Sequence, residues 1–125
     1  MAKWCADANM DAMLAAIAVA TKLHVCSGQP ANYAGIAAVE LAVVTLTAGD
    51  GNGDYTIGNG DSSGRKLTVG AQTGITITAS DDATHIALSN GSDTLLYVTT
   101  CTTQTLTSGG TVDVPAWDIE VSDPS

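Results

Sequence analysis

Hydrophobic and polar residues alternate in several short runs in the second half of the chain. These runs are rich in β-branched and aliphatic side chains, and Gly, Asn, Asp or Ser separates each run from the next. They comprise residues 65–69, 74–78, 85–89, 94–101 and 117–121. Alternation with a period of two places apolar side chains on one face of a strand. The pattern therefore predicts antiparallel sheets that bury one face and expose the other to water.

A different period governs the N-terminal segment. Met10, Met13, Leu14 and Ile17 are spaced by three or four residues, and alanine fills most of the positions between them. This spacing predicts an amphipathic helix over about residues 8–21. Its apolar stripe is expected to pack on the sheet or, alternatively, on a neighbouring subunit.

Weaker signals lie between the helix and the clear strands. Residues 23–26 are predicted to form a short strand, and residues 31–37 one helical turn. Residues 39–46 are predicted to form a further strand, with a helix as the competing interpretation. Residues 48–64 are rich in Gly, Asp and Asn, which tolerate positive φ, so they are expected to form a long loop. Within this loop, residues 55–57 are expected to pair briefly as an edge strand.

Turn signals connect the later strands. Asn90-Gly91 predicts a hairpin between the runs at residues 85–89 and 94–101. Ser108 and the two glycines after it predict another turn. Pro115 cannot donate to a ladder of hydrogen bonds, so an edge, a bulge or a break is expected there.

These signals together predict a mainly β protein, an antiparallel β-sandwich or jelly-roll-like fold with one N-terminal α-helix. The length of 125 residues fits a single domain. Its expected parts are a helical segment over residues 1–22 and a β-rich body over residues 23–125, which includes the long loop at 48–64.

Charge and cysteine content narrow the functional classes. The chain carries 13 carboxylates against 4 Lys and Arg residues, a formal net charge of −9. Such a surface repels DNA, RNA and anionic lipid, so we expect neither nucleic acid nor membrane as a partner. No stretch reaches the roughly 18 apolar residues that a spanning helix needs. Cys5, Cys26 and Cys101 cannot all pair within the chain, so buried free thiols are expected.

A calcium loop is the first candidate site. Asp50, Asn52 and Asp54 space oxygen ligands as the front of such a loop does, and Asp61 stands at the twelfth position. However, Tyr55 occupies the position where the turn needs glycine, and Asp61 replaces the bidentate glutamate. A plain solvated turn is the competing and favoured interpretation, so no metal or other cofactor is expected.

Other candidate chemistry is weaker. His24 and Cys26 lie two residues apart on one predicted strand and so face the same side, but no orienting group follows from the sequence. Arg65-Lys66 is the one cationic cluster. It could hold an anion, begin a solvated strand, or donate a salt bridge to an acidic patch on another subunit. No catalytic constellation emerges, so the chain is not expected to be an enzyme.

Six stretches carry a resemblance to a known family. They are residues 24–30 (HVCSGQP), 61–69 (DSSGRKLTV), 74–80 (GITITAS), 83–88 (ATHIAL), 95–101 (LLYVTTC) and 115–124 (PAWDIEVSDP). In this order they resemble small virion structural proteins of tailed bacteriophages. The resemblance covers most of the chain from about Lys22 onward, with residues 49–60 matching least.

The resemblance implies a capsid cement or decoration protein that bridges and stabilises neighbouring major capsid subunits. Such a protein is made in the host bacterial cytoplasm and is expected on the outer surface of the virion, as a homo-oligomer (dimer or trimer). The alternative is a tail- or head-attached β-sandwich binding module, an adhesin or a connector. The interface candidates are Tyr55, Arg65 and Lys66 in or beside the long loop, and Met10, Leu14 and Ile17 on the helix.

Overall fold

The computed structural model describes residues 6–51, 54–61 and 64–121. Within them the protein is mainly β, with antiparallel sheets and an N-terminal helix, so the predicted fold class is confirmed. The chain divides into two compact units, each built from separate stretches of sequence. The first unit is drawn from residues 1–19, 47–71 and 115–125, and the second from residues 20–46 and 72–114.

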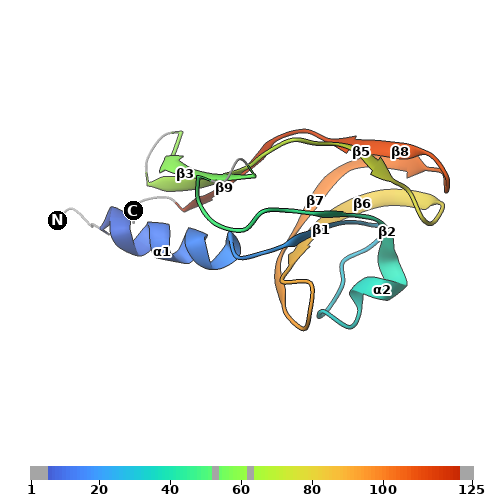
Figure 1. Ribbon diagram of the computed structural model, residues 1–125, viewed down its shortest axis with the longest axis horizontal. Coiled ribbons are helices and arrows are strands. Elements are labelled where there is room, and N and C mark those ends of the chain that lie inside the picture. Colours follow the sequence, from blue (N-terminus) through green and yellow to red (C-terminus); the bar gives the residue numbers. More distant parts are fainter. Residues whose placement is uncertain (1–5, 52–53, 62–63, 122–125) are drawn as a thin grey trace. The chain divides into compact units, whose positions relative to one another are not determined.

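The first unit combines one helix with one sheet. Its elements are α1 (Asp7–Ile17), β3 (Tyr55–Asn59), β4 (Arg65–Val69) and β9 (Trp117–Val121). The strands form an antiparallel sheet in the order β3-β4-β9, and α1 packs against it (Figure 1). The strand expected inside the long loop therefore exists as β3, and it is an edge strand as predicted.

Alternating side chains explain how this sheet buries one face. Leu67 and Val69 on β4 are fully buried, as are Met10 and Leu14 on α1. On β9, Ile119 is buried while the acidic neighbours on either side of it are exposed. A half-buried antiparallel sheet produces this alternation.

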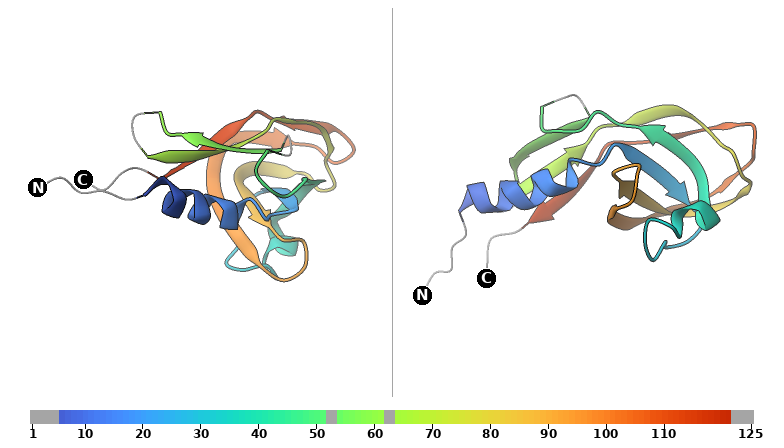
Figure 2. Two further views of the ribbon diagram at one scale, coloured as in Figure 1. Left: turned by 60° about the vertical axis from the view of Figure 1, so that its left-hand side comes forward. Right: turned by 60° about the horizontal axis from the view of Figure 1, so that its bottom comes forward.

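The second unit is built almost entirely of strands. Its elements are β1 (Lys22–Cys26), α2 (Ile36–Val39), β2 (Glu40–Thr45), β5 (Gln72–Thr76), β6 (Asp81–Ser89), β7 (Leu95–Leu106) and β8 (Thr111–Val114). A four-stranded sheet has the order β2-β1-β6-β7, and β5 pairs with β8 (Figure 2). An isolated bridge between Ala42 and Ile77 connects β2 to the residue after β5.

The β6–β7 hairpin confirms the strongest turn signal. The side-chain Oδ1 of Asn90 accepts hydrogen bonds from the backbone N–H groups of the three residues Ser92, Asp93 and Thr94. Gly91 has φ of 78°, and a Cβ there would come within 3.1 Å of the side chains of Thr21 and Lys22. Positive φ and close approach together require glycine at this position.

Several boundaries differ from the predicted ones. Strand β6 begins at Asp81 rather than at residue 85, β5 covers Gln72–Thr76 rather than 74–78, and the helical turn lies at Ile36–Val39 rather than at 31–37. Helix α1 ends at Ile17 rather than near Thr21, because Thr21 already belongs to the second unit's hydrogen-bond network. Its N–H donates to the carbonyl of Ser89, and its carbonyl accepts from Leu46. Strand β7 continues past Cys101 to Leu106, because its later residues pair with the beginning of β6.

Candidate functional site

The most organised polar cluster lies inside the second unit, across three neighbouring strands. His24 on β1 contacts Glu40 on β2 through Nδ1 and Oε1, at 2.6 Å. Its other ring nitrogen, Nε2, lies 2.8 Å from Oγ of Ser89 on β6. This sheet has β1 between β2 and β6, so one imidazole ring reaches a partner on each side.

Hydrogen-bond chemistry assigns the protons in this cluster. The ionised carboxylate of Glu40 can only accept, so Nδ1 of His24 donates to it. In the neutral ring, Nε2 then accepts from the hydroxyl of Ser89. The same Oγ also accepts from the N–H of Gly91 at 3.2 Å. Each polar group of the cluster therefore has a partner, which is the condition under which buried polar groups are tolerated.

The order Ser–His–Glu matches the hydrogen-bonded chain of a serine hydrolase. However, Ser89 has 0% exposed surface and His24 has 6%. A nucleophile must reach the carbonyl carbon of its substrate, and a fully buried hydroxyl does not. In this structure the cluster therefore stabilises the β2-β1-β6 sheet.

The two described cysteines are poor nucleophiles. Burial, and then the negative charge of Glu40, raise the pKa of the Cys26 thiol from the ordinary 9.0 to about 12. Burial also raises the pKa of Cys101. Both thiols are therefore protonated near neutral pH, whereas the reactive species is the thiolate. His24 directs its two ring nitrogens to Glu40 and Ser89, although Cys26 lies two residues further along the same strand.

The described calcium candidates form contacts within the first unit. Asp50 accepts a hydrogen bond from the N–H of Ile57, and Asp54 accepts one from the N–H of Thr47. Asp61 forms an ion pair with a lysine, and Asn52 lies outside the described residues. Within the described part of the chain, no group of three or more His, Cys, Asp or Glu is placed to hold a metal ion.

Arg65 and Lys66 connect elements of the first unit through ion pairs and hydrogen bonds. Arg65 on β4 donates from Nε and Nη2 to both carboxylate oxygens of Asp11 on α1, at 2.7 and 3.3 Å. Its Nη1 donates to Asn59 on β3. Lys66 contacts Asp61 at 2.8 Å and Asp118 at 3.5 Å. The three possibilities for this pair did not include what the structure shows, which is ion pairs with acidic residues of the same chain.

The remaining interface candidates occupy the first unit's own core. Tyr55, Met10 and Leu14 are fully buried, and Ile17 is half-buried. Burial, and then the charge of Asp54, raise the pKa of Tyr55 to about 12. Met10 and Leu14 of the helix stripe therefore pack on the unit's own sheet, whereas Met13 of the same stripe is 51% exposed.

Comparisons with known proteins identify no relative. The chain matches no family model, no curated protein and no solved structure. Among the residues that the structure describes, no helix has both the length and the apolar character needed to cross a membrane. Any proposed function therefore depends on the residues and on their geometry.

Proposed function

We propose that this chain is a structural protein of a bacteriophage virion, a cement or decoration protein that bridges neighbouring major capsid subunits. The six stretches that resemble small phage virion proteins support this role. So does the fold class, because compact antiparallel β units are well suited to forming contacts with other chains through their strand edges.

The observation that carries the proposal is how the chain uses its polar groups. Four candidate side chains are committed to internal contacts: His24 and Ser89 inside one sheet, and Arg65 and Lys66 between elements of the other unit. The strands β3, β9, β2 and β7 lie at sheet edges. In such a protein, these strand edges and the acidic surface are the parts that can contact a partner.

A serine hydrolase site is the competing interpretation of the hydrogen-bonded cluster of Ser89, His24 and Glu40. We infer that the cluster serves the fold, because Ser89 is fully buried. A fluorophosphonate probe tests this inference, with Ser89→Ala as the matched control. We expect no labelling of the folded protein. Labelling that Ser89→Ala abolishes would instead establish a reactive serine.

Electron cryo-microscopy of intact particles of the encoding phage tests the virion role. We expect many symmetric copies on the outer shell, each bridging capsid subunits. A few copies at the tail or portal would replace the cement role with that of a connector or adhesin. Particles without this density would overturn the proposal.

A further inference from the structure

Strand β7 is a long sheet edge without charge. It runs from Leu95 to Leu106 and pairs with β6, and no described strand pairs with its other side. Residues 94–112 contain no Asp, Glu, Lys or Arg, although the whole chain carries a net charge of −9. Soluble proteins usually protect such edges with charged residues or proline. β7 has neither, and only the irregularities in its pairing with β6 protect its edge, so part of this edge stays open to an added strand.

Irregular pairing confines the part of β7 that can accept a new strand. Register shifts occur between Leu88 and Ser89 and between Ala83 and His85 on β6. Between these shifts, residues 97–100 of β7 pair in continuous register with residues 85–88. Bulges disrupt a ladder, so we expect an added strand to hydrogen-bond mainly along this central stretch.

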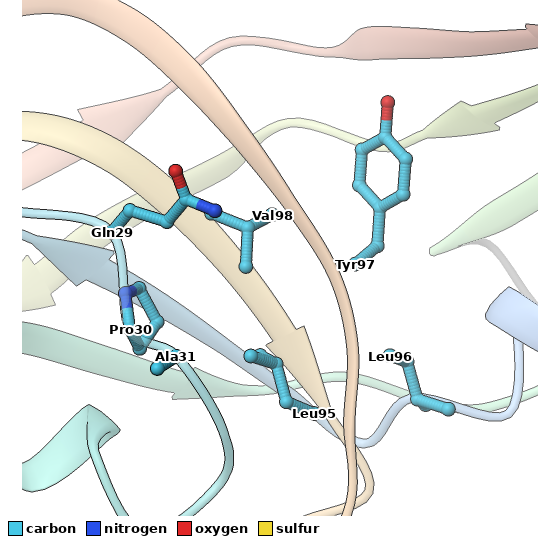
Figure 3. Close-up of a pocket in the computed structure, with 7 residues that line it drawn as sticks. All are labelled: Gln29, Pro30, Ala31, Leu95, Leu96, Tyr97 and Val98. Carbon is cyan, nitrogen blue, oxygen red and sulfur yellow. The ribbon is translucent and has the colours of Figure 1, made fainter.

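A shallow depression adjoins this stretch. It has a volume of about 390 Å³. It is lined by Gln29, Pro30, Ala31, Leu95, Leu96, Tyr97 and Val98. Leu95 and Val98 point toward the loop that carries Pro30, whereas Leu96 and Tyr97 lie on the other side of the strand (Figure 3). None of the seven residues is charged, so the depression suits an uncharged side chain of an occupant.

Carboxylates stand near both ends of β7. Asp93 precedes β7, and Asp81 and Asp82 on β6 pair with Leu106 and Thr105 at the far end of β7. All three carboxylates are exposed. Hydrogen bonds from Asn90 and Thr94 lower the pKa of Asp93. Among the described residues, none of the three carboxylates forms an ion pair with a cation of this chain.

We propose that the β7 edge binds an extended segment of a partner protein, with an uncharged, β-branched centre and Lys or Arg at both ends. The centre adds to residues 97–100 as a strand and places one uncharged side chain in the depression. The basic ends meet Asp93 on one side and Asp81 and Asp82 on the other. This deepens the proposed function by giving the chemistry of the partner's segment, but it follows from β7 alone and does not require a capsid.

A second copy of this chain is a poorer occupant. In an antiparallel pair of two β7 strands, the Asp93 end of one copy meets the Leu106 end of the other. The carboxylates of Asp81 and Asp82 lie at that end, so like charges gather at both ends of the pair. Like-charge contacts at an interface suppress the wrong partner.

A peptide-display selection on the purified full-length protein tests the proposal. The library varies a six-residue uncharged centre between two flanks, which are either Lys-Lys or Glu-Glu. We expect selected clones to carry Lys flanks and β-branched centres, with Lys flanks enriched by about tenfold or more. Equal recovery of Lys and Glu flanks, or no enrichment, would overturn the proposal.

Two measurements on a selected synthetic peptide locate the site and the mode of binding. Thr100→Lys places a charge in the binding stretch and should weaken binding about tenfold or more, since an edge lysine opposes strand addition. Thr56→Lys, on the edge strand β3, is the matched control and should bind as the original protein does. Equal thermal midpoints for the two variants would show that both are folded. Equal binding by both would overturn the site.

Backbone methylation then distinguishes strand addition from side-chain docking. In an added strand, every second peptide N–H faces β7. Two peptides are therefore compared, one methylated at its odd-numbered nitrogens and one at its even-numbered nitrogens. Methylation should abolish binding of one of these peptides and spare binding of the other. Equal effects on both peptides would overturn strand addition. Sedimentation of the protein without peptide tests whether a second copy binds the β7 edge instead. We expect no dimer through this edge. A dimer that Thr100→Lys dissociates would make a second copy the occupant. These tests need no particle, so their failure is separate from failure of the virion role.

Discussion

The two units hold their polar side chains together in different ways. In the first unit the ion pairs lie near the surface: the side chains of Arg65 and Asp11 are 19% and 35% exposed. In the second unit the His24 side chain is 7% exposed, and Ser89 is fully buried. Exposed ion pairs contribute little to stability, whereas a buried polar group that loses its partner is costly. Mutations in the ion pairs of the first unit and in the His24 cluster of the second should therefore change the free energy of unfolding by very different amounts.

The largest effect is expected from His24→Ala. This change removes a buried ring, and with it the acceptor for the Ser89 hydroxyl and the Nδ1 donor to Glu40. Loss of packing and of two hydrogen bonds should lower the free energy of unfolding by about 3 kcal/mol. Equilibrium denaturation in urea measures this loss.

Two further variants check that the loss comes from hydrogen bonding. Glu40→Gln keeps an oxygen acceptor for Nδ1 of His24, so it should cost about 1 kcal/mol or less. Ser89→Ala removes the partner of Nε2 and should cost about 1–3 kcal/mol. A cost for Glu40→Gln as large as that for His24→Ala would contradict the assignment of the protons.

The next largest effect is expected at alkaline pH, which should lower the free energy of unfolding. The folded pKa of Cys26 is raised from 9.0 to about 12, so the folded state resists losing this proton while the unfolded state gives it up. The associated stability is complete below pH 9 and is lost as pH rises toward the folded value. By about pH 10.5 the loss from this group is roughly 2 kcal/mol.

Substitutions in each unit separate the two alkaline contributions. Cys26→Ala should flatten the decline in unfolding free energy that begins near the ordinary Cys pKa of 9.0. Tyr55→Phe should flatten the part that begins near the ordinary Tyr pKa of 10.0, since burial raises that folded pKa to about 12 as well. Denaturation curves across this range measure both. An unchanged slope in Cys26→Ala would show that its thiol does not titrate differently on unfolding.

A smaller effect is expected from Arg65→Met, which removes the bidentate contact with Asp11. The loss should be smaller than that of His24→Ala, and high salt should diminish it. Salt shortens the screening length from about 10 Å at 0.1 M to about 3 Å at 1 M. Thermal midpoints of both proteins at the two salt concentrations measure this. A loss independent of salt would point to packing of the arginine stem instead.

The smallest effect is expected from Lys66→Met. Its partner Asp61 is 68% exposed, so water already screens this pair. The variant should unfold close to the original protein at both salt concentrations. A loss of thermal stability as large as that of Arg65→Met would show that the Arg65 and Lys66 ion pairs contribute equally, which would contradict this prediction.

Local pattern explains which elements were predictable. Strand β4 begins and ends at the predicted residues, because residues 65–69 alternate clearly. The end of β7 was missed because residues 102–105 are uniformly polar, so no alternation marks them. Glu40 and Ser89 lie 16 and 65 positions from His24 along the chain. Their meeting depends on β1 lying between β2 and β6, an order that no local spacing specifies.

The discontinuous make-up of the two units has a consequence for synthesis on the ribosome. All strands of the second unit have been made once Val114 is translated, but the first unit still lacks β9 (Trp117–Val121). Until then its sheet consists of β3 and β4 alone, and an isolated two-stranded hairpin is marginally stable in water. The N-terminal helix, although translated first, therefore waits for the last strand before its sheet is complete.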